Sequence, residues 1–357
     1  MQNGLIPLAT VLMLAATGCG QLGGVCEEDC AQEQGSAGTT GTGGTPATTP
    51  GVVPADVTAI PDGQRVVGYL PTWGSSLPSY ATPAILSRLT HVAIAFANVT
   101  PSAVTFANGN DVRSFVAEAR RYNVKVLVSI GGANGSDAVA ELITPANLPT
   151  FVANTMKCVE DFQLDGVDVD IEGGAVNQDY EPLVVALSNE LKPRGLTLSS
   201  AVGNWFADSI TPTALGLFDF VQVMAYDACG SWTDACPHSS LDLATSQIAF
   251  WVEQRGVPAD RMVLGVPFYA RSWGANAHDI VPYSEILGLF PDAWQTDWID
   301  SGGTQYSYNG HATIQSKVEI GKAHGGMMIW DLISDEIDPG TRDLGSHSLL
   351  RVLNDSY

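Results

Sequence analysis

Short apolar runs alternate with longer amphipathic stretches along most of the chain. Eight runs rich in Val, Ile and Leu have the length of buried strands, at 66–70, 91–99, 125–130, 166–171, 196–201, 219–225, 262–268 and 326–330. Between them, apolar residues recur at helical spacing over 111–122, 148–162, 180–191, 241–255 and 313–324. Strands that alternate with helices predict a parallel α/β sheet. Eight such units without a glycine-rich nucleotide-binding loop favour a (β/α)8 TIM barrel over a doubly wound sheet.

The fourth run carries three carboxylates at alternate positions, Asp168, Asp170 and Glu172. Side chains alternate between the two faces of a strand, so these acids share one face and lie roughly 6.6–7 Å apart. In a barrel strand the intervening Val and Ile would face the helices, and the acids would line the interior towards the catalytic mouth. Three like charges in a low-dielectric core cannot all ionise, so at least one pKa should be raised. A raised carboxyl is suited to general acid catalysis at neutral pH.

The acidic run allows two other interpretations. Its beginning is similar to a calcium-binding EF-hand loop, but the twelfth position is Asp179 instead of the required Glu. The Val and Ile residues between the acids also favour a strand over a loop. A solvated edge strand that exposes the acids and buries the valines is compatible with the same periodicity.

The first part of the chain has the features of an export signal followed by a tether. Residues 5–17 form an apolar run that is too short to span a bilayer. Small residues then precede Cys19, which is similar to a bacterial lipoprotein signal, although no Lys or Arg occurs before Arg65. We therefore expect a signal over 1–18, a lipid anchor on Cys19, a Gly/Thr/Pro-rich tether over 19–57 and a single catalytic domain over 58–357. The alternative is a cleaved signal that releases a secreted protein.

Charge and cysteine content limit the partners. With 16 Lys+Arg against 38 Asp+Glu, the net charge is −22, so the chain should repel nucleic acid and anionic membrane surfaces. We expect membrane contact only through the lipid at Cys19. Cys229 and Cys236 lie in one loop and form a possible disulfide in an oxidising compartment, as do Cys26 and Cys30. Cys158 is expected to be a buried core residue. The spacings fit no zinc pattern, so no metal or cofactor is expected.

The spacing Asp165-x-x-Asp168-x-Asp170-x-Glu172 resembles the signature of glycoside hydrolase family 18, the chitinases and related enzymes. Six further segments resemble motifs of that family and occur in the family's order along the chain, at 67–73, 91–96, 129–132, 224–227, 265–271 and 325–330. The resemblance covers about residues 65–335. Many members carry an α+β insertion between strands seven and eight. Here only residues 269–324 are available, so we expect that insertion to be absent or shortened.

The resemblance implies a retaining mechanism in which the substrate's own 2-acetamido group is the nucleophile. Glu172 would protonate the glycosidic oxygen and later activate water. Asp170 would orient the acetamide and stabilise the positive charge on the sugar ring, and Asp168 would share a proton with Asp170. Tyr226 would hydrogen-bond the acetamide carbonyl.

The resemblance also implies a set of substrate-binding residues. They are Asp227, Met224, Trp330, Tyr69, Phe96, Arg271 and Trp73. Trp330 would form the floor under the reacting sugar, whereas Arg271 either contacts substrate or pairs with an acid. Ser129 and the glycines after it are expected to support the acidic strand. Gly173 and Gly174 follow Glu172 where many members have a bulky residue and a proline, which leaves the details of the subsites open.

The expected activity is that of an endo-acting chitinase on chitin or chitooligosaccharides, exported and monomeric. A shortened insertion implies a shallow cleft and endo or non-processive action. One alternative is an endo-β-N-acetylglucosaminidase acting on N-glycans, which shares the mechanism. Another is a non-catalytic, lectin-like barrel that binds chitin. The intact Glu172 argues against the latter, because inactive members typically lose this residue.

Overall fold

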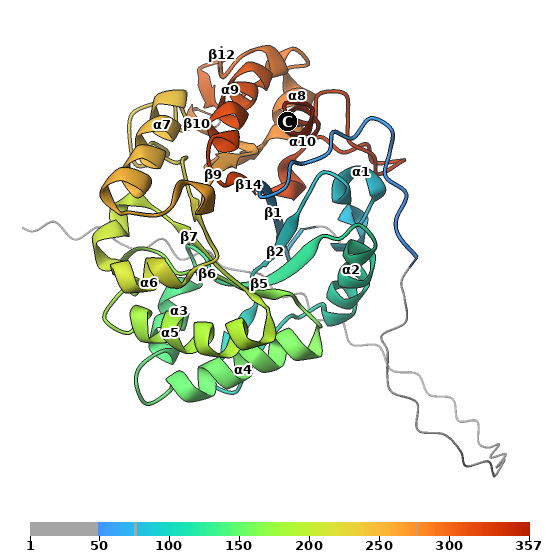
Figure 1. Cartoon of the computed structure of the whole chain (residues 1–357). Coiled ribbons are helices and arrows are strands. Elements are labelled where there is room, and N and C mark those ends of the chain that lie inside the picture. Colours follow the sequence, from blue (N-terminus) through green and yellow to red (C-terminus); the bar gives the residue numbers. More distant parts are fainter. Residues whose placement is uncertain (1–48, 75–76, 276) are drawn as a thin grey trace, which may run out of the picture. The chain divides into compact units, whose positions relative to one another are not determined.

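A computed structural model describes residues 49–74, 77–275 and 277–357. In this part of the chain, eight parallel strands close into a barrel in the order β1-β14-β9-β8-β7-β6-β5-β2 (Figure 1). They are β1 (Arg65–Pro71), β2 (His91–Ala95), β5 (Lys125–Gly131), β6 (Gly166–Asp170), β7 (Thr197–Val202), β8 (Phe220–Val223), β9 (Met262–Pro267) and β14 (Gly326–Trp330). Each corresponds to one of the eight predicted runs, which confirms the (β/α)8 barrel.

Helices surround the strands (Figure 1). They are α1 (Pro83–Leu86), α2 (Gly109–Arg121), α3 (Ser136–Leu142), α4 (Leu148–Asp161), α5 (Tyr180–Leu191), α6 (Pro212–Leu217), α7 (Leu241–Ala249), α8 (Tyr283–Leu289), α9 (His311–Lys322) and α10 (Leu349–Asp355). The five predicted helices are α2, α4, α5, α7 and α9. Because α7 continues into a π-helical turn, η5 (Phe250–Gln254), the predicted stretch 241–255 is helical nearly throughout.

The second predicted strand is shorter than expected. The run 91–99 divides into β2 and the first strand of a hairpin, β3 (Asn98–Thr100) with β4 (Ala103–Thr105). The chain leaves the barrel at Phe96, and the next backbone N–H, that of Ala97, donates to the Ser129 carbonyl at the end of β5. An apolar run cannot show where a strand leaves its sheet, because the same residues suit both pairings.

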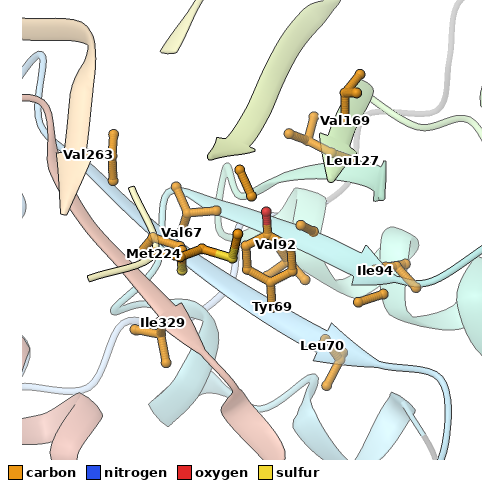
Figure 2. Close-up of a cluster of buried hydrophobic side chains, with 14 of the residues drawn as sticks. Val67, Tyr69, Leu70, Val92, Ile94, Leu127, Val169, Met224, Val263 and Ile329 are labelled. Atoms are coloured by element: carbon orange, nitrogen blue, oxygen red, sulfur yellow. The ribbon is translucent and has the colours of Figure 1, made fainter. Parts of the chain in front are cut away.

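The barrel strands are buried on both faces, as expected for a parallel sheet enclosed by helices. Figure 2 shows part of this core, in which Val, Ile and Leu side chains from several barrel strands gather around Tyr69 and Met224. Val67, Val92 and Val169 are fully buried. Burial of each such side chain contributes about 1.5–3 kcal/mol, so the barrel is a rigid support for groups at its mouth.

A compact insertion separates β9 from β14. It contains a four-stranded antiparallel sheet in the order β11-β10-β13-β12, together with α8. The strands are β10 (Tyr269–Gly274), β11 (Val281–Pro282), β12 (Trp298–Ser301) and β13 (Thr304–Ser307). The insertion is therefore present in a short form, one of the two forms that the sequence allowed.

The segment before β1 packs on the helices. The Gly51 N–H donates to the Arg121 carbonyl (2.7 Å), and the Thr58 N–H donates to Asn354 Oδ1 (2.9 Å). Asp56 pairs with the buried Arg88 (2.7 Å). These contacts place residues 51–58 against α1, α2 and α10.

Several sequence predictions fall on residues 1–48, which lie outside the described residues. They are the export signal, the lipid anchor at Cys19, the Cys26–Cys30 pair and most of the tether. In the rest of the chain, among the residues that the structure describes, no helix is both long and apolar enough to cross a bilayer.

A buried carboxylate attaches the last helix to the barrel, which leads to a stability prediction. Asp335 accepts hydrogen bonds from Ser348 Oγ (2.6 Å) and from the Leu349 and Leu350 N–H groups (2.8 and 3.1 Å) at the start of α10. Asp335→Ala leaves these donors unpaired, so we expect the free energy of unfolding in urea to fall by about 2–4 kcal/mol. Asp355→Ala, at an exposed position of the same helix, is the control and should change it by less than about 0.5 kcal/mol. Equal losses in the two variants would contradict this role of Asp335.

Candidate active site

The lowest acid of β6 is held inside the barrel by four hydrogen-bond donors. Asp168 is fully buried, and its Oδ2 accepts from Tyr69 Oη (2.7 Å) and Ser129 Oγ (2.8 Å). Its Oδ1 accepts from Ser199 Oγ (2.7 Å) and Gln222 Nε2 (2.9 Å). These donors come from β1, β5, β7 and β8, so the carboxylate lies in the barrel interior. The interpretation as a solvated edge strand is wrong, because β6 pairs with both β5 and β7.

Asp170 is the next acid towards the mouth, and it is 3% exposed. Burial, reinforced by the charges of Glu172 and Asp168, raises the pKa of Asp170 well above its ordinary range. Its Oδ1 is buried and has no hydrogen-bond partner among the described residues. Burial also raises the pKa of Asp168, against the effect of its four donors. The alternating acids of this strand predict such a rise, because three carboxylates on one inward face cannot all ionise.

The approach of β5 to Asp170 requires glycine. Gly131 has φ +110°, and a Cβ at this position would collide with the Asp170 carbonyl oxygen. The N–H of Gly132 donates to that oxygen (2.7 Å). Together with the bond from Ser129 to Asp168, these contacts confirm that this motif supports the acidic strand.

Glu172 follows the end of β6 at the mouth of the barrel. Its backbone N–H donates to Ser136 Oγ (2.9 Å), and its side chain is partly exposed. Burial and the nearby charge of Asp227 raise the pKa of Glu172 to about 7. A carboxyl that still carries its proton near neutral pH, and that can be reached from outside, has the properties of a general acid.

Asp227 is a fixed anion beside this acid. It accepts hydrogen bonds from Tyr269 Oη (2.8 Å) and from Arg271 through Nε (2.8 Å) and Nη2 (2.7 Å). The His238 Nδ1 lies 3.3 Å from its Oδ1. Burial acts to raise the pKa of Asp227, but hydrogen bonds from His238 and Arg271 and the charge of Arg271 hold it at about 2. The carboxylate therefore stays ionised over the working range of an enzyme.

Arg271 pairs with acids on two sides, which is one of the two roles that the sequence left open for it. Besides Asp227, it contacts Asp279 (2.9 Å), and its guanidinium lies over the ring of Trp232 at 5.0 Å from the centroid. Trp232 is itself more than half exposed. The loop that carries it is closed by the Cys229–Cys236 disulfide, the pairing that the sequence marked as possible.

Residues 224–227, just beyond the end of β8, form a wall of the site. Tyr226 and Met224 belong to it and lie just before Asp227 in the sequence. Both side chains are buried, and the Tyr226 ring meets the Tyr269 ring edge-on at 6.2 Å. Burial, with the charge of Asp170 as the next cause, raises the pKa of Tyr226 well above its ordinary range. Its phenol therefore keeps its proton and is available as a hydrogen-bond donor.

Four aromatic side chains form a cluster at the mouth. The Trp330 ring, at the end of β14, lies 5.4 Å from Tyr69, 5.8 Å from Phe96 and 6.4 Å from Trp73. Trp73 also stacks on Phe96 and is 50% exposed. These residues come from three parts of the sequence and meet because β1 lies between β14 and β2. Flat apolar surfaces of this kind suit the face of a sugar ring.

Cys158 is buried in α4 with a free thiol, as the sequence predicts. Trp251 is also fully buried in the core. Trp205 is exposed at the end of β7, whereas Trp273 stacks on Trp298 within the insertion.

Sequence reasoning missed three residues that support the carboxylates. Ser199 and Gln222 are polar residues at inward positions of β7 and β8, so the same alternation that identified the acids could have marked them. His238 had no signal of this kind. It lies in a loop, and only the folded chain brings its ring to Asp227.

The chain resembles known glycosidases over most of its described length. Residues 65–335 match Glycosyl hydrolases family 18. The GH18 chitinase ChiB of Flavobacterium johnsoniae is 34% identical, with 82% of this chain and 94% of that chain covered and a TM-score of 0.71. A chitinase from Bacteroides thetaiotaomicron is 25% identical, over 82% of this chain and 96% of that chain, with a TM-score of 0.69.

Curated relatives include proteins with different names. The oviduct-specific glycoprotein of Homo sapiens and probable chitinase 10 of Drosophila melanogaster are each 26% identical, over 82% and 81% of this chain. The chain spans only 53% and 16% of their lengths. The family match covers well over half of the sequence and includes the acidic strand, the wall and the aromatic cluster. The chain therefore belongs to glycosyl hydrolase family 18.

Proposed function

We propose that this protein is an endo-acting chitinase that hydrolyses β-1,4 bonds between N-acetylglucosamine units and retains the anomeric configuration. One observation carries the proposal. Glu172, whose pKa is raised to about 7, lies at the barrel mouth between the buried Asp170 and the fixed anion Asp227. The similarity to chitinases of known structure supports the choice of substrate.

The first step of the proposed reaction is cleavage assisted by the substrate. Glu172 donates its proton to the glycosidic oxygen while the carbonyl oxygen of the substrate's acetamide attacks the anomeric carbon. The bond to the leaving sugar breaks, and a cyclic oxazolinium ion forms. Asp170 accepts a hydrogen bond from the acetamide N–H and stabilises the positive charge that develops on the sugar ring. Tyr226 donates a hydrogen bond from its phenol to the acetamide carbonyl oxygen and holds that oxygen in line for attack.

The second step reverses the role of the acid. Glu172, now a carboxylate, takes a proton from water, and the water oxygen attacks the anomeric carbon from the face that the leaving sugar vacated. The oxazolinium ring opens and restores the acetamide, so two inversions give net retention. Asp168 shares a proton with Asp170, because two neighbouring buried carboxyls cannot both carry charge. Trp330, Phe96 and Trp73 support the sugar rings, and the buried Tyr69 packs behind Trp330.

We also propose that the protein is exported and acts as a monomer, either anchored through lipid at Cys19 or released. The disulfide between Cys229 and Cys236 supports an oxidising compartment. The short insertion supports endo or non-processive action, because it adds only a small sheet beside the mouth.

The activity itself is tested with the full chain and N-acetylglucosamine oligomers of four to six units, beside a high-mannose glycopeptide. We expect cleavage of the oligomers, with products identified by mass and the β-anomer in excess in early NMR spectra. Cleavage of the glycopeptide alone would reassign the protein as an endo-β-N-acetylglucosaminidase. Binding of the oligomers without cleavage would identify a lectin-like member.

Replacing the acid separates catalysis from binding. Glu172→Gln keeps the size of the side chain but cannot donate the proton, so we expect kcat to fall by a factor of about 10²–10⁴. The dissociation constant for the tetramer, measured by calorimetry, should change less than about threefold. Glu285→Gln, on the exposed surface of α8, is the matched control and should keep full activity. Turnover by Glu172→Gln at the native rate would show that another group is the acid.

The pH dependence of activity follows from Glu172 and Asp227. Activity should decline as pH rises through about 7, because Glu172 then loses the proton that it donates. The negative charge of Asp227 helps to raise this pKa, so Asp227→Asn should lower it and move the alkaline limb of kcat/KM by about half to one pH unit towards acid. Asp279→Asn, which changes only the exposed partner of Arg271, should leave the limb in place. The limb is measured on the residual activity of each variant, and a shift towards alkaline pH in Asp227→Asn would contradict the assignment.

A further inference from the structure

A lysine without a carboxylate partner lies buried behind the wall that carries Tyr226 and Asp227. Lys317 is on α9 and is fully buried. Its ammonium donates to the Ser239 carbonyl, to Ser239 Oγ and to Asn309 Oδ1, each at 2.7 Å. Three acceptors match the three protons of an ammonium group. Among the ion pairs of the described residues, none includes Lys317.

Such a group is costly to keep in a protein core. Burial lowers the pKa of Lys317 to about 7, which means that the charged form is disfavoured there. An apolar side chain of similar length would avoid this cost. Lys317 has no direct part in the proposed mechanism, but its hydrogen bonds extend towards residues that do.

The bond to Ser239 leads to the wall itself. Ser239 Oγ uses its single proton in a hydrogen bond to the Ala225 carbonyl (2.7 Å). It therefore acts as the acceptor in its hydrogen bond with the Lys317 ammonium. Ala225 lies between Met224 and Tyr226, just beyond the end of β8. Two hydrogen bonds thus connect the lysine with the backbone that carries Tyr226.

The residue before Ser239 makes the second connection. The His238 N–H donates to Ser307 Oγ (3.0 Å), and its carbonyl accepts from the Ala228 N–H (3.0 Å). Its Nδ1 faces Asp227, whereas its Nε2 is buried without a partner among the described residues. The Asp227 backbone N–H also donates to Nδ1 (3.4 Å), so the ring of His238 contacts both the backbone and the carboxylate of Asp227.

We propose that Lys317 is a positioning residue of the active site, which acts through Ser239 and His238 to hold Tyr226 and the Asp227 carboxylate in their catalytic places. The ammonium fixes the Ser239 backbone and hydroxyl on one side, and Asn309 Nδ2 donates to the same carbonyl (2.8 Å). The loop that contains His238 is thereby attached to α9 and to the end of the insertion. This inference rests on the proposed chitinase function.

The role differs from simple stabilisation in what it predicts for kinetics. A merely structural lysine would change the fraction of folded enzyme, but each folded molecule would turn over normally. A displaced Tyr226 or Asp227 slows the chemical step and leaves most sugar contacts in place. Errors of about 1 Å in such positions can cost up to about a hundredfold in rate.

The test compares Lys317→Met, which keeps the length of the side chain, with Ser239→Ala and with Lys322→Met. Lys322 lies on the same helix and pairs with Glu319 near the surface, so it is the matched control. We expect kcat on the tetramer, per folded molecule, to fall about ten- to a hundredfold in Lys317→Met, with KM changed less than about threefold. Ser239→Ala should show the same split, and the double variant should lose little more than Lys317→Met alone. The control should stay within about twofold.

A second readout needs no turnover. The ¹⁵N NMR signals of the His238 ring report whether Nδ1 carries its proton beside Asp227. They should change in Lys317→Met and Ser239→Ala but not in Lys322→Met. If the native protein cleaves the tetramer and both Lys317→Met and Ser239→Ala keep kcat within about twofold, the inference is wrong and the chitinase function stands. If the native protein cleaves nothing, the proposed function fails, and unchanged His238 signals would then overturn the inference as well. Should Lys317→Met fail to fold, Ser239→Ala decides by the same criteria.

Discussion

Three carboxyl groups share the inward face of a single strand, and most features of the site follow from this. Asp168 can lie at the bottom because four hydroxyl or amide donors surround it from four other strands. Asp170 then lies in its field and in the low-dielectric interior, so it resists ionisation, whereas Glu172 at the mouth has its pKa raised by burial and by the charge of Asp227. The barrel makes this arrangement possible, because its closed ring of strands directs donors inward at the same height.

The mouth contains a second charge system with the opposite behaviour. Asp227 receives hydrogen bonds from Tyr269 and Arg271 of the short insertion and stays ionised. Glu172 thus keeps its proton near neutral pH, whereas the nearby Asp227 stays ionised. Burial and different hydrogen-bond partners produce this difference between two carboxyl groups. The insertion contributes to this contrast, so its role extends beyond forming a side of the cleft.

The strands and the site residues differ in how well the sequence predicts them. All eight barrel strands could be located, since short apolar runs bounded by polar turns are typical of strands buried on both faces. The run 91–99 reads as one strand from sequence, because no local signal marks the point where the chain leaves the sheet at Phe96. In the site, the acids, Tyr226 and Trp330 could be identified from motifs. The ring of His238 and the ammonium of Lys317 could not, because their partners are distant in sequence.

The sequence by itself determined the barrel and the acidic face, because alternation along a strand is a local property of the chain. Membership of family 18 rests on the same local motifs. Only the tertiary structure decided which groups keep their protons, since a pKa depends on burial and on charges brought from remote segments. It also decided that Arg271 pairs with Asp227 and that Lys317 lies behind the wall. Such contacts join residues 44 and 78 positions apart, and no local pattern encodes them.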